Sequence, residues 1–102
     1  QNQWEYSFQS RFGPKAWIKP YTETTLETWA KSGVRSVDIA CPGFPVDCLE
    51  TLEEIAMQDR ELFIANGGEK LNYIPALNDS ALQINFLREL ITQKCADWLS
   101  DP

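Results

Sequence analysis

The chain contains no histidine and few basic residues. Its 102 residues include nine lysines and arginines against fifteen aspartates and glutamates, so the formal net charge is −6. Without an imidazole, the chain by itself cannot build a Ser-His-Asp or Cys-His catalytic group or a histidine-based metal site. The negative charge argues against a phosphate-backbone binder and a polybasic membrane anchor, so we expect no nucleic-acid partner.

Cysteines are scarce, and long apolar runs are missing. Cys41, Cys48 and Cys95 are too few and too scattered for a disulfide framework or a four-thiolate zinc site. Their odd number favours a reducing compartment. No apolar run approaches the roughly 20 residues of a membrane-spanning helix, and no signal-peptide pattern opens the chain. We therefore expect a cytoplasmic location.

The composition that is present suits one folded domain. Hydrophobic residues make up 43% of the chain and include four tryptophans, which is enough for a core. The chain starts at Gln1 and not at a methionine. We therefore expect a piece of a longer protein, truncated on its N-terminal side.

The rest of the chain is organised around residues 34–54, which the pattern predicts to be a strand, a loop and a helix start. Val37, Ile39 and Cys41 alternate with polar or small residues, as on a half-buried strand. Pro42 and the glycine after it end that strand, and an N-capping aspartate, Asp47, precedes the helix. The carboxyl ends of strands are where open α/β sheets place their chemistry.

The predicted helix has an apolar and an acidic face. Its apolar face comprises Leu52, Ile55, Ala56, Leu62 and Phe63. Its acidic face comprises Asp47, Glu50, Glu54 and Glu61, with Gln58 among them. An acidic helix face is usually solvated surface, and acidic residues also suit a helix N-terminus. From the pattern alone both interpretations stay open, and the surface one is favoured.

The first part of the chain predicts a strand, a loop and a helix. Residues 4–10 alternate aromatic and polar side chains, and a loop with Arg11 and Trp17 follows. Such a loop either binds a ligand or is held to the body by its apolar residues. A helix then starts at Thr22 or Thr24, runs to about Lys31 and is closed by a glycine. Its predicted core face consists of Leu26, Trp29 and Ala30.

The last part predicts a third strand at 71–74 and a helix capped by Ser80 and Gln83. That helix is expected to bury Ile84, Leu87, Leu90, Ile91 and Trp98. The order is therefore β-α-β-α-β-α. It predicts a three-layer α/β fold, with a small parallel sheet flanked by helices.

Beyond these patterns, the chain resembles the C-terminal part of the ferrochelatase family, in the bacterial type without an iron–sulfur tail. The matching stretches are 6–13 (YSFQSRFG), Trp17, 20–22 (PYT), 41–44 (CPGF), 47–55 (DCLETLEEI), 60–63 (RELF) and 73–78 (YIPALN). They cover nearly the whole chain in the family's order and spacing. The resemblance implies that residues 1–102 are one chelatase-like, or flavodoxin-like, lobe of a two-lobe enzyme that inserts Fe²⁺ into protoporphyrin IX.

The resemblance also implies roles for acidic residues. Glu50 corresponds to the catalytic and metal-facing glutamate, opposite a histidine from the preceding part of the protein. Glu54 matches a second carboxylate in an inward-facing line. Gln58 stands where some relatives are acidic, and Cys48 stands where some have a second histidine. A carboxylate suits this chemistry, because a base must accept the pyrrole protons and ferrous iron accepts oxygen ligands.

The resemblance implies that Trp17 and the segment from Phe8 to Phe12 form one side of the porphyrin cleft. Arg11, Phe12 and Trp17 are the predicted substrate-binding residues. The resemblance implies no cofactor beyond the substrate Fe²⁺, no iron–sulfur cluster, and the missing N-terminal lobe as partner. It allows at most a peripheral association with the inner membrane.

Two alternatives remain at this stage. A flavodoxin-like binding or signalling module, such as a receiver domain, needs acidic residues after its first strand, where this chain has Gln9, Ser10 and Arg11. The other alternative is an inert structural half-domain.

Overall fold

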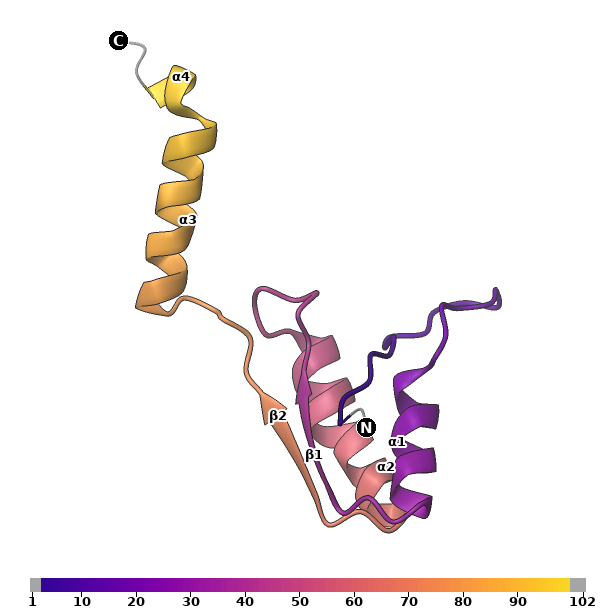
Figure 1. Cartoon of the computed structure of the whole chain (residues 1–102). Coiled ribbons are helices and arrows are strands. Elements are labelled where there is room, and N and C mark those ends of the chain that lie inside the picture. The colour runs from indigo at the N-terminus through magenta and orange to yellow at the C-terminus, as the bar shows by residue number, and fades with distance from the viewer. Residues whose placement is uncertain (1–2, 100–102) are drawn as a thin grey trace.

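The computed structural model describes residues 3–99, which form an elongated molecule (Figure 1). Its extents are 62, 32 and 29 Å. In chain order, the elements are α1 (Thr22–Lys31), β1 (Ser36–Ala40), the π-helix η1 (Glu50–Asp59), α2 (Arg60–Ala65), β2 (Lys70–Ile74), α3 (Ala81–Lys94) and α4 (Ala96–Leu99). Over the described range, no helix has both the length and the apolar character needed to cross a membrane.

Strands β1 and β2 form a parallel pair, with Val37 opposite Leu71 and Ile39 opposite Tyr73. Parallel strands need a long crossover, and here η1 and α2 provide it. The two strands predicted around Val37 and Leu71 are therefore confirmed, together with the helix between them. The described part of the chain is an α/β structure with a two-stranded sheet.

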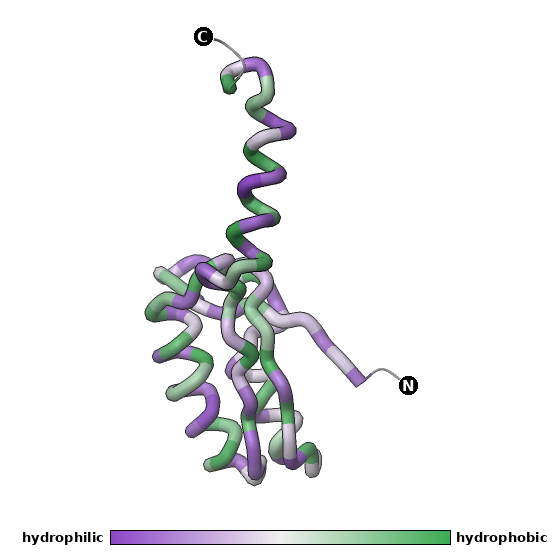
Figure 2. The backbone as a smooth tube through the Cα atoms, turned by 90° about the vertical axis from the view of Figure 1, so that its left-hand side faces the viewer, coloured by the Kyte–Doolittle hydropathy of each residue, from purple (hydrophilic) through white to green (hydrophobic). Residues whose placement is uncertain are grey.

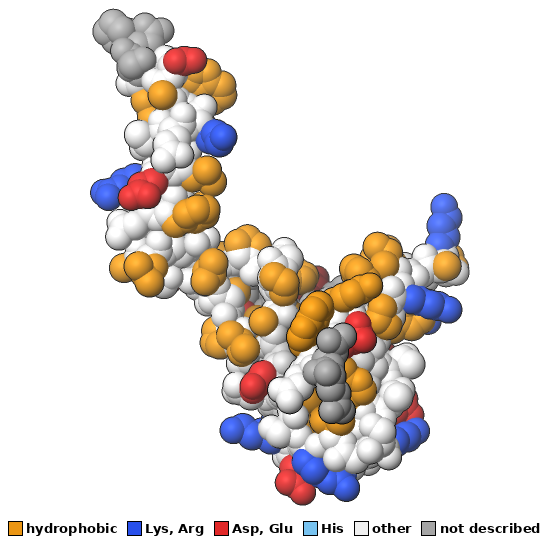
Figure 3. Space-filling view, viewed as in Figure 1, with side chains coloured by type: hydrophobic (Ala, Val, Ile, Leu, Met, Phe, Trp, Pro, Cys, Tyr) orange, Lys and Arg blue, Asp and Glu red, His pale blue; other side chains and the backbone are white. Residues whose placement is uncertain are grey.

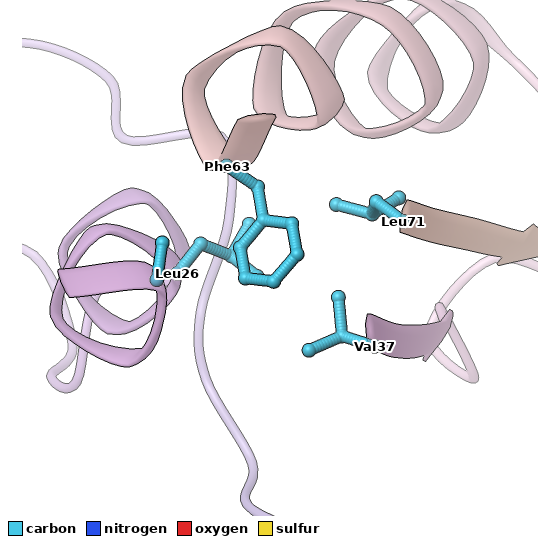
Figure 4. Close-up of a cluster of buried hydrophobic side chains, with 5 residues drawn as sticks. Leu26, Val37, Phe63 and Leu71 are labelled. Carbon is cyan, nitrogen blue, oxygen red and sulfur yellow. The ribbon is translucent and has the colours of Figure 1, made fainter. Parts of the chain in front are cut away.

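The core lies where α1, α2 and the inner face of the sheet meet. Figure 4 shows the side chains of Leu26, Val37, Phe63 and Leu71 gathered around one another. Phe63 is completely buried, and Ala30 completes the cluster. The core face predicted for the first helix is thus confirmed, with Trp29 packed at its edge.

Residues 4–10 do not form the predicted strand. Only Phe8 pairs with another segment, through an isolated parallel bridge to Tyr21 just before α1. Trp4 and Tyr6 stay 70% and 62% exposed. Alternation predicts which side chains would share a face, but a strand also needs an adjacent backbone to pair with. Beyond the single bridge, this segment has no such partner among the described residues.

The start of α1 also differs from the prediction. Its N-cap is Tyr21, and no side chain caps it. The Thr22 side chain is buried and exchanges a hydrogen bond with Ser7 Oγ at 2.8 Å, so a tertiary contact replaces the capping role. The helix ends at Lys31 as predicted, and Gly33 has a φ of +103°, which favours glycine.

Helix α3 begins as predicted, since Ser80 Oγ accepts a hydrogen bond from Gln83 N at 3.3 Å. However, it points away from the sheet (Figures 1 and 2). The side chains predicted to be buried are 37% to 82% exposed: Ile84, Leu87, Leu90, Ile91 and Trp98. The outer face of the sheet, with Asp38 and Asn72, is exposed as well. The described residues therefore form two layers, and the expected third layer is missing from them.

Candidate functional site

The candidate site lies beyond the carboxyl end of β1. The strand stops at Ala40, and the loop that follows contains a turn in which Phe44 N donates to Cys41 O at 3.0 Å. The helical segment begins at Glu50. The predicted order of strand, loop and helix is thus confirmed.

Asp47 holds this loop to β2 and to the segment that follows it. Its Oδ1 accepts hydrogen bonds from Tyr73 Oη at 2.6 Å, Thr51 Oγ1 at 3.0 Å and Ala76 N at 3.3 Å. Its Oδ2 accepts from Asn78 Nδ2 at 2.9 Å. One carboxylate therefore joins the start of η1 to three positions far along the chain.

The predicted capping role of Asp47 is wrong. The N-cap position of η1 is Leu49, without a side-chain cap. A short carboxylate can satisfy helix N–H groups or more distant donors. In this fold the donors that follow β2 are in reach, so Asp47 bonds to them.

We expect Asp47 to make the fold sensitive to acid. The hydrogen bond from Tyr73, followed by that from Asn78, lowers the pKa of Asp47 to about 2. A lowered carboxyl pKa contributes stability that is present above the ordinary value near 4 and is lost as the pH falls toward 2. Asp47→Asn should therefore lower stability at pH 7 and flatten its decline in acid, measured by urea unfolding from pH 2 to 7.

Asp79→Asn, at an exposed position, is the matched control. It should leave the decline of stability with falling pH unchanged. The same decline in Asp47→Asn as in the unmodified chain would contradict the role given to the Asp47 network.

The helix that carries the predicted acidic residues is a π-helix from Glu50 to Asp59. In a π-helix the backbone bonds join residues five apart, so side chains five apart become neighbours. Gln58 Nε2 accordingly donates to Glu53 Oε1 at 3.3 Å. Gln58 therefore lies beside Glu53, and the residue five positions after Glu54 is Asp59. The predicted acidic face, which assumed a period of 3.6 residues and placed Gln58 beside Glu54, is therefore wrong for Gln58.

The same change of period alters the apolar face. Ile55 and Phe63 are buried as predicted, whereas Leu52 is half exposed. A ten-residue π-helix is rare, and the spacing of apolar residues in the sequence does not predict one.

Glu50 is the first residue of η1, and its side chain is exposed. A hydrogen bond from the Cys48 side chain lowers the pKa of Glu50, which favours its carboxylate form. The backbone oxygen of Glu50 accepts a hydrogen bond from Gln9 Nε2 at 2.8 Å. The start of η1 is thus tied to the segment near Phe8.

Glu54, one turn further along, is half-buried and hydrogen-bonded on both oxygens. Ser10 N donates to Oε2 at 2.7 Å, and Ser10 Oγ donates to Oε1 at 2.6 Å. Gln9 Nε2 also donates to Oε1 at 3.1 Å. A carboxylate that accepts three hydrogen bonds is held in one place.

Gln9 links Glu50 and Glu54 to a third predicted site residue. Trp17 Nε1 donates to Gln9 O at 3.1 Å. The structure therefore brings together Glu50, Glu54 and Trp17, which are far apart in the sequence. Gln9 and Ser10 were not among the predicted site residues, because they are ordinary polar positions of an alternating segment. The available signal was their place within the segment from Phe8 to Phe12, which the family resemblance assigns to one side of the cleft.

Two pockets adjoin this network. One, of about 310 Å³, includes Gln9, Ser10, Arg11 and Glu54 in its lining, together with the first residues of α1. Arg11 also lies with its guanidinium carbon 5.0 Å from the centre of the Tyr21 ring, a cation–π arrangement.

The second pocket, of about 500 Å³, is lined by Trp17 and residues 41–44 among others, and shares Phe8, Gln9 and Ser10 with the first. Phe12 lines neither pocket and is 83% exposed. Figure 3 shows hydrophobic side chains exposed both on the body and along α3.

The cysteines of the site are free thiols. Burial, followed by the charges of Glu54 and Asp47, raises the pKa of Cys41 to about 11, so this thiol stays protonated at neutral pH. Between residues 3 and 99, no three histidine, cysteine or acidic side chains are grouped closely enough to hold a metal ion.

Comparison with known proteins supplies independent information on the chain. The family model described as Ferrochelatase matches residues 1–95. No solved structure matches the chain.

Three curated relatives are each named Ferrochelatase. The protein of Nitrosococcus oceani is 51% identical over 96% of this chain and 27% of its own length. That of a Psychrobacter species is 53% identical over 98% of this chain and 30% of its own length. That of Edwardsiella ictaluri is 54% identical over 88% of this chain and 28% of its own length. The chain thus spans less than a third of the curated relatives it matches.

Proposed function

The chain belongs to the ferrochelatase family, and from this premise we propose that it is the C-terminal part of an enzyme that inserts Fe²⁺ into protoporphyrin IX to give protohaem. Similarity to proteins named Ferrochelatase runs over nearly the whole chain. That extent favours this function over a flavodoxin-like signalling module or an inert half-domain.

The chain supplies one lobe of a two-lobe enzyme, with the porphyrin in the cleft between the lobes. The remaining lobe precedes this chain and carries the histidine that faces the metal. The exposed apolar side chains of α3 support this arrangement, because a row of exposed apolar side chains often marks a surface that packs against protein.

Glu50 accepts a pyrrole proton and contacts the entering iron. Insertion of Fe²⁺ releases two N–H protons from the porphyrin, and each needs an acceptor near the metal. The lowered pKa of Glu50 keeps a carboxylate available as both proton acceptor and oxygen ligand. Glu54 is the next carboxylate and passes the proton away from the metal.

Trp17, Phe12 and Arg11 line the porphyrin side. The observation that carries the proposal is the Gln9 network, in which one residue bonds to Trp17, Glu50 and Glu54. It joins the predicted porphyrin wall to the Glu54 carboxylate and to the backbone of Glu50, at the start of the helix that carries both predicted proton acceptors.

The enzyme needs no cofactor beyond its substrate Fe²⁺ and carries no iron–sulfur cluster. We place it in the cytoplasm, with at most a peripheral association with the inner membrane. Both statements are carried over from the family resemblance.

A chimaera tests the proposed function. In the Nitrosococcus oceani relative, the matching segment is replaced by this chain, and iron insertion is followed by the loss of protoporphyrin fluorescence. We expect insertion by the chimaera and none by the 102-residue chain alone, because that chain has no histidine. A folded chimaera without insertion, or insertion by the chain alone at the rate of the relative, would contradict the proposal.

A further inference from the structure

Asp59 is a buried carboxyl group that the proposed reaction does not use. It is the last residue of η1 and is only 1% exposed. It ranks with Ile55, Thr51 and Phe63 among the fully buried side chains. Aspartate is rarely buried to this degree unless it is paired.

The surroundings of Asp59 do not compensate a negative charge. Its Oδ2 is buried and has no hydrogen-bond partner among the described residues. The one ion pair within residues 3–99 joins Lys31 to Glu27, so no basic side chain is paired with Asp59. An ionised carboxylate in such a place is costly, and the group takes up a proton instead.

The charges that act on Asp59 are those of two acidic side chains. Glu54 lies five positions earlier on the same π-helix, and Glu23 comes from α1. Both Glu54 and Glu23 line the 310 Å³ pocket. Burial first, then the charge of Glu23 and that of Glu54, raises the pKa of Asp59 to about 7. Cys41, in the loop after β1, is influenced by Asp59 in turn.

Glu54 and Asp59 differ in their hydrogen bonds. Glu54 accepts three, from Ser10 and Gln9, whereas Asp59 Oδ2 accepts none. When two neighbouring carboxyl groups compete for a proton, the group without donors holds it. We propose that Asp59 is a positioning residue for Glu54: as a neutral acid it lets the Glu54 side chain keep its hydrogen bonds from Ser10 and Gln9.

This arrangement has a direct consequence for pH. When Asp59 ionises, its negative charge repels the neighbouring Glu54 side chain and weakens the contacts of Glu54 with its hydrogen-bond donors. Folding raises the pKa of Asp59, so the stability that depends on its protonated form is fully present below about pH 4, near the ordinary pKa of an aspartate. That stability is lost as the pH rises through about 7. Asp59→Asn keeps the shape of the side chain and removes this ionisation.

The first test uses the chain itself and does not depend on its function. The chain is labelled with ¹³C-glutamate, and the Glu54 carboxyl signal is followed from pH 5 to 9. We expect the signal to shift with a midpoint near pH 7, and this shift to be absent in Asp59→Asn. The urea midpoint of Asp59→Asn should exceed that of the parent at pH 8 but not at pH 4. The same shift near pH 7 in Asp59→Asn as in the unmodified chain would overturn the proposal.

The second test rests on the proposed function and uses the chimaera. At pH 6, the iron-insertion rate of the Asp59→Asn chimaera should match that of the unmodified chimaera within about twofold. The ratio of the rate at pH 8 to the rate at pH 6 should be about three- to tenfold higher in Asp59→Asn than in the unmodified chimaera. Asp79→Asn, the same change at an exposed site, should leave the ratio unchanged. Loss of activity at pH 6, or an unaltered ratio, would overturn the role of Asp59. If the unmodified chimaera is inactive, the proposed function fails, and the first test still decides the coupling.

Discussion

Replacing Glu50 by glutamine in the chimaera should lower the rate of iron insertion by about 10²- to 10⁴-fold, the usual contribution of a positioned proton acceptor. Glutamine keeps the size of the side chain and removes its negative charge. The site then lacks both the base for the pyrrole proton and the anionic oxygen for iron. Porphyrin binding should change by less than about twofold, because the predicted porphyrin wall lies in the loop with Trp17.

Stopped-flow fluorescence separates these two effects. Quenching of porphyrin fluorescence in the absence of metal reports binding, and the slower loss after addition of Fe²⁺ reports insertion. Glu53→Gln is the matched control, since it removes an exposed charge from the same helix and should keep the parent rate. An undiminished insertion rate in Glu50→Gln, or equal losses in both variants, would rule out the role given to Glu50.

The second large effect is expected from Gly68→Ala. Gly68 is buried against the core, and its N–H donates to Phe63 O at 2.9 Å. A Cβ at this position would lie 2.2 Å from Phe63 Cε2 and 2.3 Å from Cδ2. These distances are far below van der Waals contact, and the completely buried ring has no free space to move into. We expect a loss of about 3 kcal/mol of unfolding free energy, the upper end for overpacking.

Urea and thermal unfolding of the chain measure this loss. For a domain of this size, it corresponds to a decrease in Tm of more than about 10 °C. Gly43→Ala is the control, because a Cβ there meets no atom within 4 Å and should cost little.

A double-mutant cycle identifies the cause of that loss. In a Phe63→Leu background, Gly68→Ala should be less costly, since the ring that the new Cβ would meet is absent. Equal costs in both backgrounds would show that the clash with Phe63 is not the cause.

Much of the local structure could be predicted from the residues alone. The alternation around Val37 and Leu71 predicts both strands, and the spacing of Leu26, Trp29 and Ala30 predicts the inner face of α1. The start of α3 at Ser80 was also predictable. These features depend on neighbours within a few residues, so a local pattern carries them.

Predictions that depend on distant partners fared less well. The aromatic alternation of residues 4–10 is typical of a strand, yet only Phe8 finds a backbone to pair with. The apolar residues of α3 are spaced for burial, yet nothing in the described part of the chain covers them. Periodicity predicts which face is apolar but cannot supply the surface against which that face packs.

For the candidate site, the family resemblance pointed to Glu50, Glu54 and Trp17. It could not reveal that Gln9 forms hydrogen bonds with all three. It also could not reveal that the Asp47 carboxylate accepts hydrogen bonds from Tyr73 and Asn78. Hydrogen bonds between such distant positions leave no trace in residue spacing.

The sequence by itself determined the family, the two strands, the course of α1 and the identity of the acidic residues, because composition and short-range spacing encode these. Only the tertiary structure decided that residues 50–59 form a π-helix, in which the neighbour of Glu54 on the helix surface is Asp59 and not Gln58. It also decided that Asp59 is buried and that its Oδ2 has no hydrogen-bond partner among the described residues. The physical reason is that helix period and burial depend on packing against elements far away in the chain. Such packing sets the charge of a carboxyl group, whereas the sequence sets only its presence.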